Sequence, residues 1–251
     1  MERLQSESPK VRRIYLISPA LLQGISWLIG RGGLNFFAQL VVSGQDNVRT
    51  TTRLAQERGT GVIFALNHTH ELDFSFPLAG VSPASPLFPM FYVAHGRSNY
   101  FKNTTLSWRR YIYGLPIFLT SWGAHPYQAG QKDYARALGY HARLLQLGKS
   151  MCIFPEGKIR EEESRPTAHG GLGYLAATTR ALVVPVSVSG VHKMTTYEFL
   201  TRKRKLHIHY GKPLYPHDII DFSLPIPDRY QKASQKVMGI IHDAITNGGT
   251  P

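Results

Sequence analysis

Two histidines and two carboxylates are concentrated in one short segment, Asn67-His68-Thr69-His70-Glu71-Leu72-Asp73. The apolar run at 61–66 predicts a buried strand before it, and residues 74–79 begin a predicted helix after it. In open α/β sheets, ligands bind at the carboxyl ends of strands. His68 and Asp73 are close enough in sequence for the turn to bring their side chains together. A carboxylate on one imidazole nitrogen fixes the tautomer and leaves the other nitrogen to accept a proton, so this pair is a candidate general base.

The same segment has two other interpretations. His68 and His70 could share a metal ion with Asp73, as in a metal-dependent hydrolase, with further ligands from His95, His125 or His169. A binuclear metallohydrolase would carry a carboxylate where this chain has Leu72, which weighs against that interpretation. The histidines could also be surface residues without a chemical role, in a protein that binds anionic lipid and catalyses nothing.

A second polar turn, Pro155-Glu156-Gly157, follows the predicted strand at 151–154. Glycine allows another group to approach the backbone closely, and a glutamate at a strand end can accept a hydrogen bond from a hydroxyl. The turn could equally be structural. Cys152 lies inside the apolar run, where a thiol is usually inert packing.

Composition limits the class of protein. The chain has 251 residues, 43% of them hydrophobic, which is enough for one sizeable domain or two small ones. The formal net charge of +13 predicts an anionic partner, such as a membrane surface, a phosphorylated substrate or nucleic acid. The chain lacks the aromatic and basic signatures of RNA-binding domains, so we expect no nucleic acid partner. A single cysteine excludes a disulfide framework and a cysteine-rich zinc site.

The first 42 residues differ in character from the rest. Residues 1–13 form a basic arm that resembles no secretory signal, which predicts the cytoplasmic side of a membrane. Two apolar segments, 14–30 and 34–41, flank Arg31-Gly32-Gly33 and predict an amphipathic helical hairpin. The first segment is too short and too polar to be predicted as transmembrane. The hairpin could pack on the core or lie in a membrane interface, where aromatic and basic residues are favoured.

The remaining residues, 43–251, predict one α/β domain. Apolar runs indicate strands at 61–66, 90–94, 116–119, 151–154, 183–190 and 205–210. Helical spacing follows Asp133, a predicted N-cap, and recurs near 172–176 and over 228–246. Strands that alternate with helices predict a mixed, largely parallel β-sheet flanked by helices.

Several of these segments together resemble the glycerolipid acyltransferases, the PlsC-type 1-acylglycerol-3-phosphate acyltransferase family. The family's N-H-x4-D block is present at 67–73, F-P-E-G at 154–157, and an apolar V-P-V strand at 184–186 that runs on to Gly190. The lead-in at 42–47 and the closing I-H-Y-G-K-P at 208–213 are also similar to the family. The match in order and spacing covers about residues 42–215.

The resemblance implies transfer of a fatty acyl group from acyl-CoA or acyl carrier protein to a hydroxyl of a lysophospholipid or related membrane lipid. His68 would be the general base and Asp73 would orient it. Glu156 and Gly157 would position the acceptor, and Lys158 or Arg160 would supply positive charge. Transfer would be direct, with the acyl thioester as co-substrate and with no metal or other cofactor. The basic surface and residues 14–42 would dock peripherally on the cytoplasmic face of an anionic membrane.

Two blocks depart from the family pattern. The second usually reads G-x-x-F-I-D-R, whereas residues 114–121 here keep a predicted strand and lack the arginine. The third usually continues T-R-S, whereas this chain reads Lys158-Ile159-Arg160. In the family these arginines concern the acceptor phosphate, so the departures affect the expected acceptor more than they affect acyl transfer.

Overall fold

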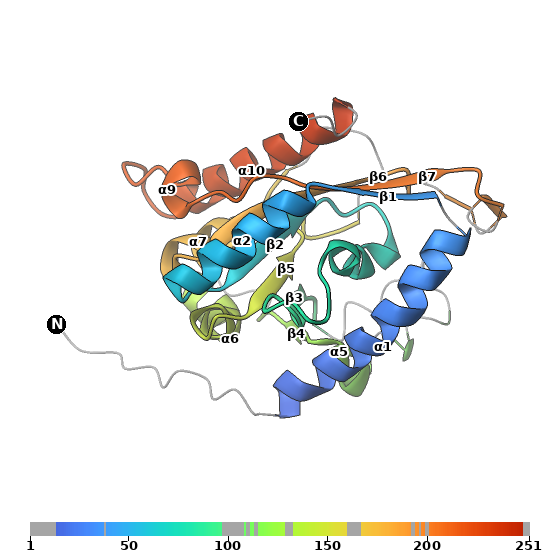
Figure 1. Ribbon diagram of the computed structural model, residues 1–251. Coiled ribbons are helices and arrows are strands. Elements are labelled where there is room, and N and C mark those ends of the chain that lie inside the picture. Colours follow the sequence, from blue (N-terminus) through green and yellow to red (C-terminus); the bar gives the residue numbers. More distant parts are fainter. Residues whose placement is uncertain are drawn as a thin grey trace.

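A seven-stranded sheet forms the centre of the computed structural model, in the order β1-β7-β6-β2-β5-β3-β4 (Figure 1). The structure describes residues 14–37, 39–96, 108, 111–112, 115–128, 133–159, 167–191, 194–195, 197–198 and 201–247. The strands are β1 (Gln39–Ser43), β2 (Val62–Leu66), β3 (Met90–Ala94), β4 (Ala124–Pro126), β5 (Ser150–Ile153), β6 (Leu182–Ser189) and β7 (Lys205–Tyr210). All neighbours are parallel except β6 and β7, which confirms the mixed, largely parallel sheet.

Strand direction determines where a site can form. Strands β6, β2, β5, β3 and β4 run the same way, so their carboxyl ends lie at one edge of the sheet. Strands β7 and β1 run the opposite way. The first and third family blocks follow β2 and β5, which are neighbours, so the topology brings the two blocks together.

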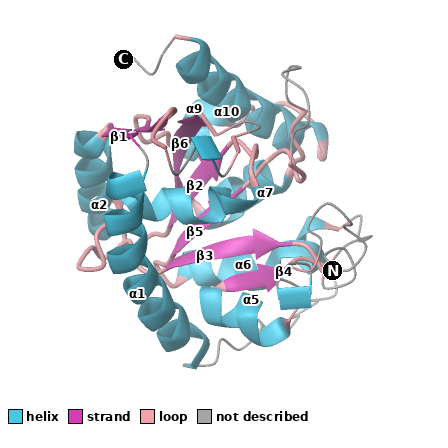
Figure 2. Ribbon diagram, turned by 90° about the vertical axis from the view of Figure 1, so that its right-hand side faces the viewer, coloured by secondary structure: helices cyan, strands magenta, loops and turns pink. Residues whose placement is uncertain are grey.

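Helices cover both faces of the sheet (Figure 2). They are α1 (Ile14–Phe37), α2 (Gln45–Arg58), η1 (Glu71–Gly80), α5 (Pro116–Trp122), α6 (Tyr134–Gln146), α7 (Gly171–Thr179), α9 (Pro216–Ile219) and α10 (Asp228–Thr246). Alternate residues of β2 point to opposite faces, as in any strand. Phe64 packs in the cluster with residues of α1, α2, η1 and α5, whereas Ile63 packs in the cluster with α6, α7 and α10.

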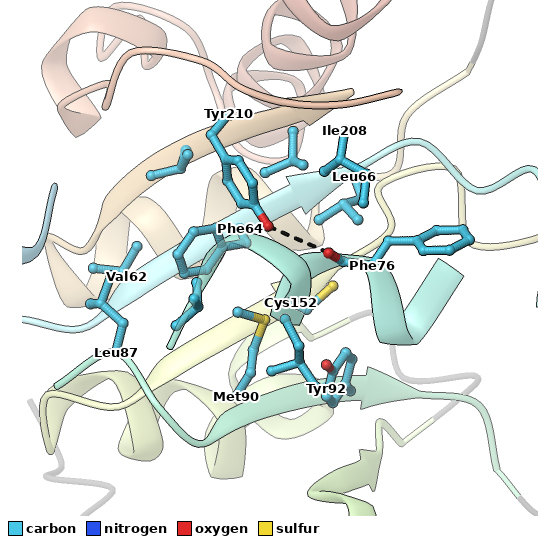
Figure 3. Packing of buried hydrophobic residues seen from close by; sticks show 14 of the residues in the cluster. Val62, Phe64, Leu66, Phe76, Leu87, Met90, Tyr92, Cys152, Ile208 and Tyr210 are labelled. Carbon is cyan, nitrogen blue, oxygen red and sulfur yellow. Dashed lines mark hydrogen bonds between the residues drawn. The ribbon is translucent and has the colours of Figure 1, made fainter. Parts of the chain in front are cut away.

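Tyr210 connects the closing strand to η1 (Figure 3). Its hydroxyl accepts a hydrogen bond from the Gly80 N–H at 2.9 Å and donates to the Pro77 carbonyl at 2.8 Å. The ring is fully buried beside Phe64, with the two ring planes nearly perpendicular. The I-H-Y-G-K-P segment therefore fixes the helix that follows the N-H-x4-D turn.

The N-terminal hairpin was predicted wrongly. Helix α1 continues through Arg31-Gly32-Gly33 for 24 residues without a break. Each glycine costs a helix only about 1 kcal/mol relative to alanine, and contacts with α5 and β1 offset that cost. The boundary predicted at 42/43 lies inside β1, which pairs with β7. Residues 1–13 lie outside the described residues. Among the helices that the structure describes, none combines the length and apolar composition needed to cross a bilayer.

The strand predicted at 116–119 is also wrong, because these residues form α5. Pro116 occupies the first turn, where its missing N–H has no cost, and Gly123 ends the helix with φ of 85°. The strand at this position in the chain is β4, a few residues later. The prediction for α6 is confirmed, since the Asp133 carboxylate accepts a hydrogen bond from the Ala135 N–H at 2.8 Å.

Candidate active site

Asn67 ties the end of β2 to β6. Its amide nitrogen donates to the Val188 carbonyl and its amide oxygen accepts from the Val188 N–H, each at 2.8 Å. The residue is buried, so both bonds are shielded from water. The asparagine of the N-H-x4-D block is therefore a structural residue, and it fixes the backbone immediately before His68.

His68 and Asp73 form the pair that their spacing predicts. The His68 Nδ1 lies 3.1 Å from Asp73 Oδ2. The same oxygen accepts hydrogen bonds from the Thr69 N–H at 2.5 Å and the His70 N–H at 2.8 Å. Because a carboxylate oxygen that receives two N–H groups acts as an acceptor, His68 donates its Nδ1–H to Asp73. The Nε2 atom of His68 then carries a lone pair and can accept a proton.

Exposure separates the roles of the two partners. The Asp73 side chain is completely buried, whereas that of His68 is 21% exposed. A buried carboxylate held by three hydrogen bonds keeps its position, and the partly exposed ring can meet a ligand. This arrangement, an oriented imidazole at the edge of a sheet, can perform general-base chemistry.

The F-P-E-G turn lies directly against the histidine. The Phe154 ring stacks on the His68 ring, with 4.3 Å between centroids and 24° between planes. Gly157 has φ of 71°, a conformation that favours glycine, and a Cβ there would lie 2.9 Å from the ring of His169. The Pro155 carbonyl accepts a hydrogen bond from the His169 N–H at 2.8 Å. The turn is thus held in one conformation beside the His68–Asp73 pair.

The other predicted site residues are placed as follows. Glu156 is buried, at 5% exposure, in the same turn, and Lys158 is exposed just after it. Arg160 lies outside the described residues. Within the described part of the chain, no three His, Cys, Asp or Glu side chains are grouped so that they could hold a metal ion. Cys152 is fully buried, and this burial raises the pKa of its thiol well above the ordinary value.

Two further residues lie at the same edge; the sequence predicted no role for Tyr127, and named His95 only as a possible metal ligand. His95 and Tyr127 are the first residues after β3 and β4. The His95 Nε2 lies 2.5 Å from the Gly157 carbonyl oxygen, and the Tyr127 hydroxyl lies 3.1 Å from His95 Nδ1. His95 follows the apolar run of β3, so the strand-end rule applied to every strand would have found it. Tyr127 was hidden because β4 was predicted in the wrong place.

Comparison with known proteins agrees with this arrangement. The sequence model of the family described as Acyltransferase matches residues 39–189, which include His68, Asp73, Glu156 and Gly157. The fold is similar to the crystal structure of the 1-acyl-sn-glycerophosphate (LPA) acyltransferase PlsC from Thermotoga maritima, with a TM-score of 0.59. That similarity covers 92% of this chain and 80% of the other, at 16% sequence identity.

The family match covers more than half of the chain, so this protein belongs to the Acyltransferase family. The resemblance drawn from the sequence blocks is confirmed at the level of family and fold, and the protein is an acyltransferase.

Proposed function

We propose that this member of the Acyltransferase family moves a fatty acyl group from an acyl thioester to a hydroxyl of a lysophospholipid or related membrane lipid. The donor would be acyl-CoA or acyl carrier protein. The observation that carries the proposal is the hydrogen bond from His68 to the buried Asp73 carboxylate, which orients a partly exposed imidazole at the strand edge. The family match supports acyl transfer, and the basic charge of the chain supports a lipid acceptor at an anionic surface.

In the proposed reaction, His68 Nε2 takes the proton of the acceptor hydroxyl as the oxygen attacks the thioester carbon. A new C–O bond forms, the C–S bond breaks, and the departing thiolate takes the proton from His68. Asp73 stabilises the imidazolium that exists between these steps. General-base assistance of this kind contributes about 10²–10⁴-fold to the rate. The reaction needs no covalent enzyme intermediate.

The turn after β5 would hold the acceptor. Glu156 and Gly157 are in the turn that contacts His68 through Phe154, so a lipid held there would place its hydroxyl near the base. Lys158 is exposed beside the turn and would attract the headgroup, with Arg160 as the second cation. The absence of the arginine usual in the family's second block leaves the identity of the headgroup open to a lipid other than lysophosphatidic acid.

The experiment is acyl-CoA turnover with a panel of lysophospholipids and related lipids. We expect His68→Ala to lower the rate about 10²–10⁴-fold and Asp73→Asn to lower it at least about 10²-fold, because the imidazole loses its orientation. His70→Ala is the matched control, since it removes a neighbouring imidazole but keeps the N–H that Asp73 accepts. Wild-type turnover by His68→Ala would disprove the mechanism.

The same variants test the two alternatives. A metal-dependent hydrolase would need both histidines, so His70→Ala would lose as much activity as His68→Ala, and a chelator would abolish turnover. A protein that only binds anionic lipid would transfer no acyl group in its wild-type form. Either result would replace the acyltransferase mechanism that we propose for His68.

We further propose that α1 docks the enzyme on an anionic membrane. Ile17, Leu21, Ile25 and Leu28 recur at helical spacing and are each 56–68% exposed. On the opposite side of α1, the buried Gln23 side chain donates to the Met90 and Trp122 carbonyls at 2.6 and 2.7 Å. The Gln23 side of α1 is therefore hydrogen-bonded to β3 and α5, while the opposite side exposes an apolar stripe. This arrangement is typical of a helix that lies in a membrane interface.

Sedimentation with phosphatidylglycerol vesicles tests this surface. Replacing both Leu21 and Leu28 by glutamate should lower the bound fraction about tenfold or more, because it places charge in the apolar stripe. Leu147→Glu is the control, since Leu147 is also exposed but follows α6 rather than α1. Equal binding by the double variant and the wild type would exclude α1 as the docking surface.

A further inference from the structure

Three strand ends meet at one chain of hydrogen bonds beside the candidate active site. Strands β5, β3 and β4 are neighbours and end at the same edge of the sheet. Gly157 belongs to the turn after β5, His95 follows β3, and Tyr127 follows β4. The hydrogen bonds run from the Tyr127 hydroxyl to His95 Nδ1, at 3.1 Å, and from His95 Nε2 to the Gly157 carbonyl.

The direction of these bonds follows from their chemistry. A carbonyl oxygen can only accept, so His95 donates its Nε2–H to Gly157. In the neutral imidazole the Nδ1 atom is then an acceptor, and the Tyr127 O–H donates to it. Tyr127 thus selects the tautomer of His95 that can hold the Gly157 carbonyl. The His95 and Tyr127 rings also pack together, with centroids 5.3 Å apart.

His169 also holds this turn. The His169 N–H donates to the Pro155 carbonyl, and the His169 ring occupies the space next to Gly157 that a side chain would need. His95 therefore supplies the contact that draws the carbonyl end of the turn toward β3. Because Phe154 stacks on His68, the position of this turn also sets the position of its residues relative to the base.

We propose that His95, oriented by Tyr127, is a positioning residue that fixes the Phe154–Gly157 turn so that a bound acceptor meets His68. This inference rests on the proposed acyl transfer. His95 does not exchange a proton with the substrate. It determines the position of the acceptor hydroxyl instead. A displacement of a reacting group by about 1 Å can lower the rate about 10²-fold.

A pair of conservative substitutions tests the direction of the bond. The amide nitrogen of glutamine reaches about as far as histidine Nε2, whereas that of asparagine reaches only as far as Nδ1. We therefore expect His95→Asn to raise the KM for the acceptor about tenfold and to lower kcat/KM about 10–100-fold, with the KM for acyl-CoA unchanged. His95→Gln should restore most of the loss.

Tyr127→Phe removes only the hydroxyl and should lower kcat/KM for the acceptor about threefold to tenfold. Combined with His95→Asn, it should cause no further loss, because the two residues act in series. Gln128→Ala is the control, since Gln128 follows Tyr127 directly and, among the described residues, its exposed side chain forms no hydrogen bond with the turn. It should keep wild-type values.

Three outcomes would overturn the inference. Wild-type kinetics in His95→Asn, an equal loss in the Gln and Asn variants, or a rise in the KM for acyl-CoA as large as that for the acceptor would each do so. Thermal unfolding of every variant separates loss of fold from loss of position. A failure of the proposed His68 mechanism can be told apart from a failure of the His95 inference. If the mechanism were wrong, His68→Ala would retain acyl transfer, whatever the His95 variants show.

Discussion

Two hydrogen-bonded pairs that contain histidine, His68–Asp73 and His141–His125, differ in burial and in the group that accepts the hydrogen bond. His68, after β2, is partly exposed and donates to a carboxylate. His141 on α6 is buried and donates its Nε2–H to the His125 main-chain carbonyl on β4 at 3.0 Å. The His125 ring lies between aromatic neighbours, with centroids 6.2 Å from Phe91 and 4.5 Å from Tyr140.

Burial has an electrostatic consequence for His125 and His141. Burial and, to a smaller extent, the nearby His141 lower the pKa of His125 to about 4. Burial likewise lowers the pKa of His141 to about 4, although its hydrogen bond to His125 partly opposes this. These two rings therefore stay neutral at physiological pH and cannot exchange protons there. The comparison shows that position at the strand edge and a carboxylate partner, rather than the residue type, distinguish the candidate base from a structural histidine.

The same substitution in both pairs would separate chemistry from stability. His68→Leu should lower acyl transfer at least about 10²-fold while the protein stays folded, because the Asp73 carboxylate keeps its hydrogen bonds from the Thr69 and His70 N–H groups. His141→Leu should lower the free energy of unfolding by about 1–3 kcal/mol, since the His125 carbonyl loses a buried donor. Turnover and urea unfolding measure the two effects.

In this crossed comparison, the folded fraction of His141→Leu should retain wild-type turnover. If His141→Leu lost turnover while remaining folded, the distinction between the two pairs would be wrong.

Acid should destabilise the protein through the buried pair. In the unfolded chain these histidines take up protons near pH 6.5, whereas in the folded protein they do so only near pH 4. Between these values the unfolded state binds more protons, so stability is complete above about pH 6.5 and falls as the pH decreases toward 4. The loss is of the order of 3 kcal/mol for each histidine.

Urea unfolding as a function of pH measures this loss. The slope between pH 6.5 and 4 should flatten in a His141→Leu variant, which has one fewer buried imidazole to protonate. An unchanged slope would show that other groups cause the acid sensitivity.

Much of the site could be predicted because its signals are local. The apolar runs at 61–66 and 151–154 were confirmed as β2 and β5, and each leads directly into its polar turn. Because β2 and β5 are neighbours in the sheet, the residues that follow them, His68 and Phe154, are in contact. The fold class followed from the alternation of strands with helices, which is likewise local.

The errors involve contacts between distant parts of the chain. Gln23 reads as a polar interruption of an apolar helix, yet its partners are main-chain groups of Met90 and Trp122, far along the sequence. These bonds hold the first half of α1 against β3 and α5. The run at 116–119 is apolar enough for a strand, but it forms a helix that begins at Pro116, is capped at its end by Gly123 and packs against α1.

A third histidine contact allows the smallest effect to be predicted. Ser43 Oγ lies 2.9 Å from His209 Nδ1, a pairing that in isolation resembles an activated serine nucleophile. Burial lowers the pKa of His209, and no Asp or Glu among the described residues forms a hydrogen bond with it. The two residues lie on β1 and β7, the strands that run against the rest of the sheet. We therefore interpret this contact as structural.

Ser43→Ala should leave acyl transfer within about twofold of the wild type and lower the free energy of unfolding by about 1 kcal/mol or less, the net worth of one hydrogen bond. Turnover, urea unfolding and mass spectrometry of the enzyme mixed with acyl-CoA provide the measurements. A hundredfold loss of turnover, together with an acyl group found on Ser43 in the wild type, would replace direct transfer by a covalent route. Direct transfer with His68 as the base needs no acyl group on Ser43. Wild-type turnover by Ser43→Ala would therefore exclude Ser43 as a nucleophile and leave His68, paired with Asp73, as the base.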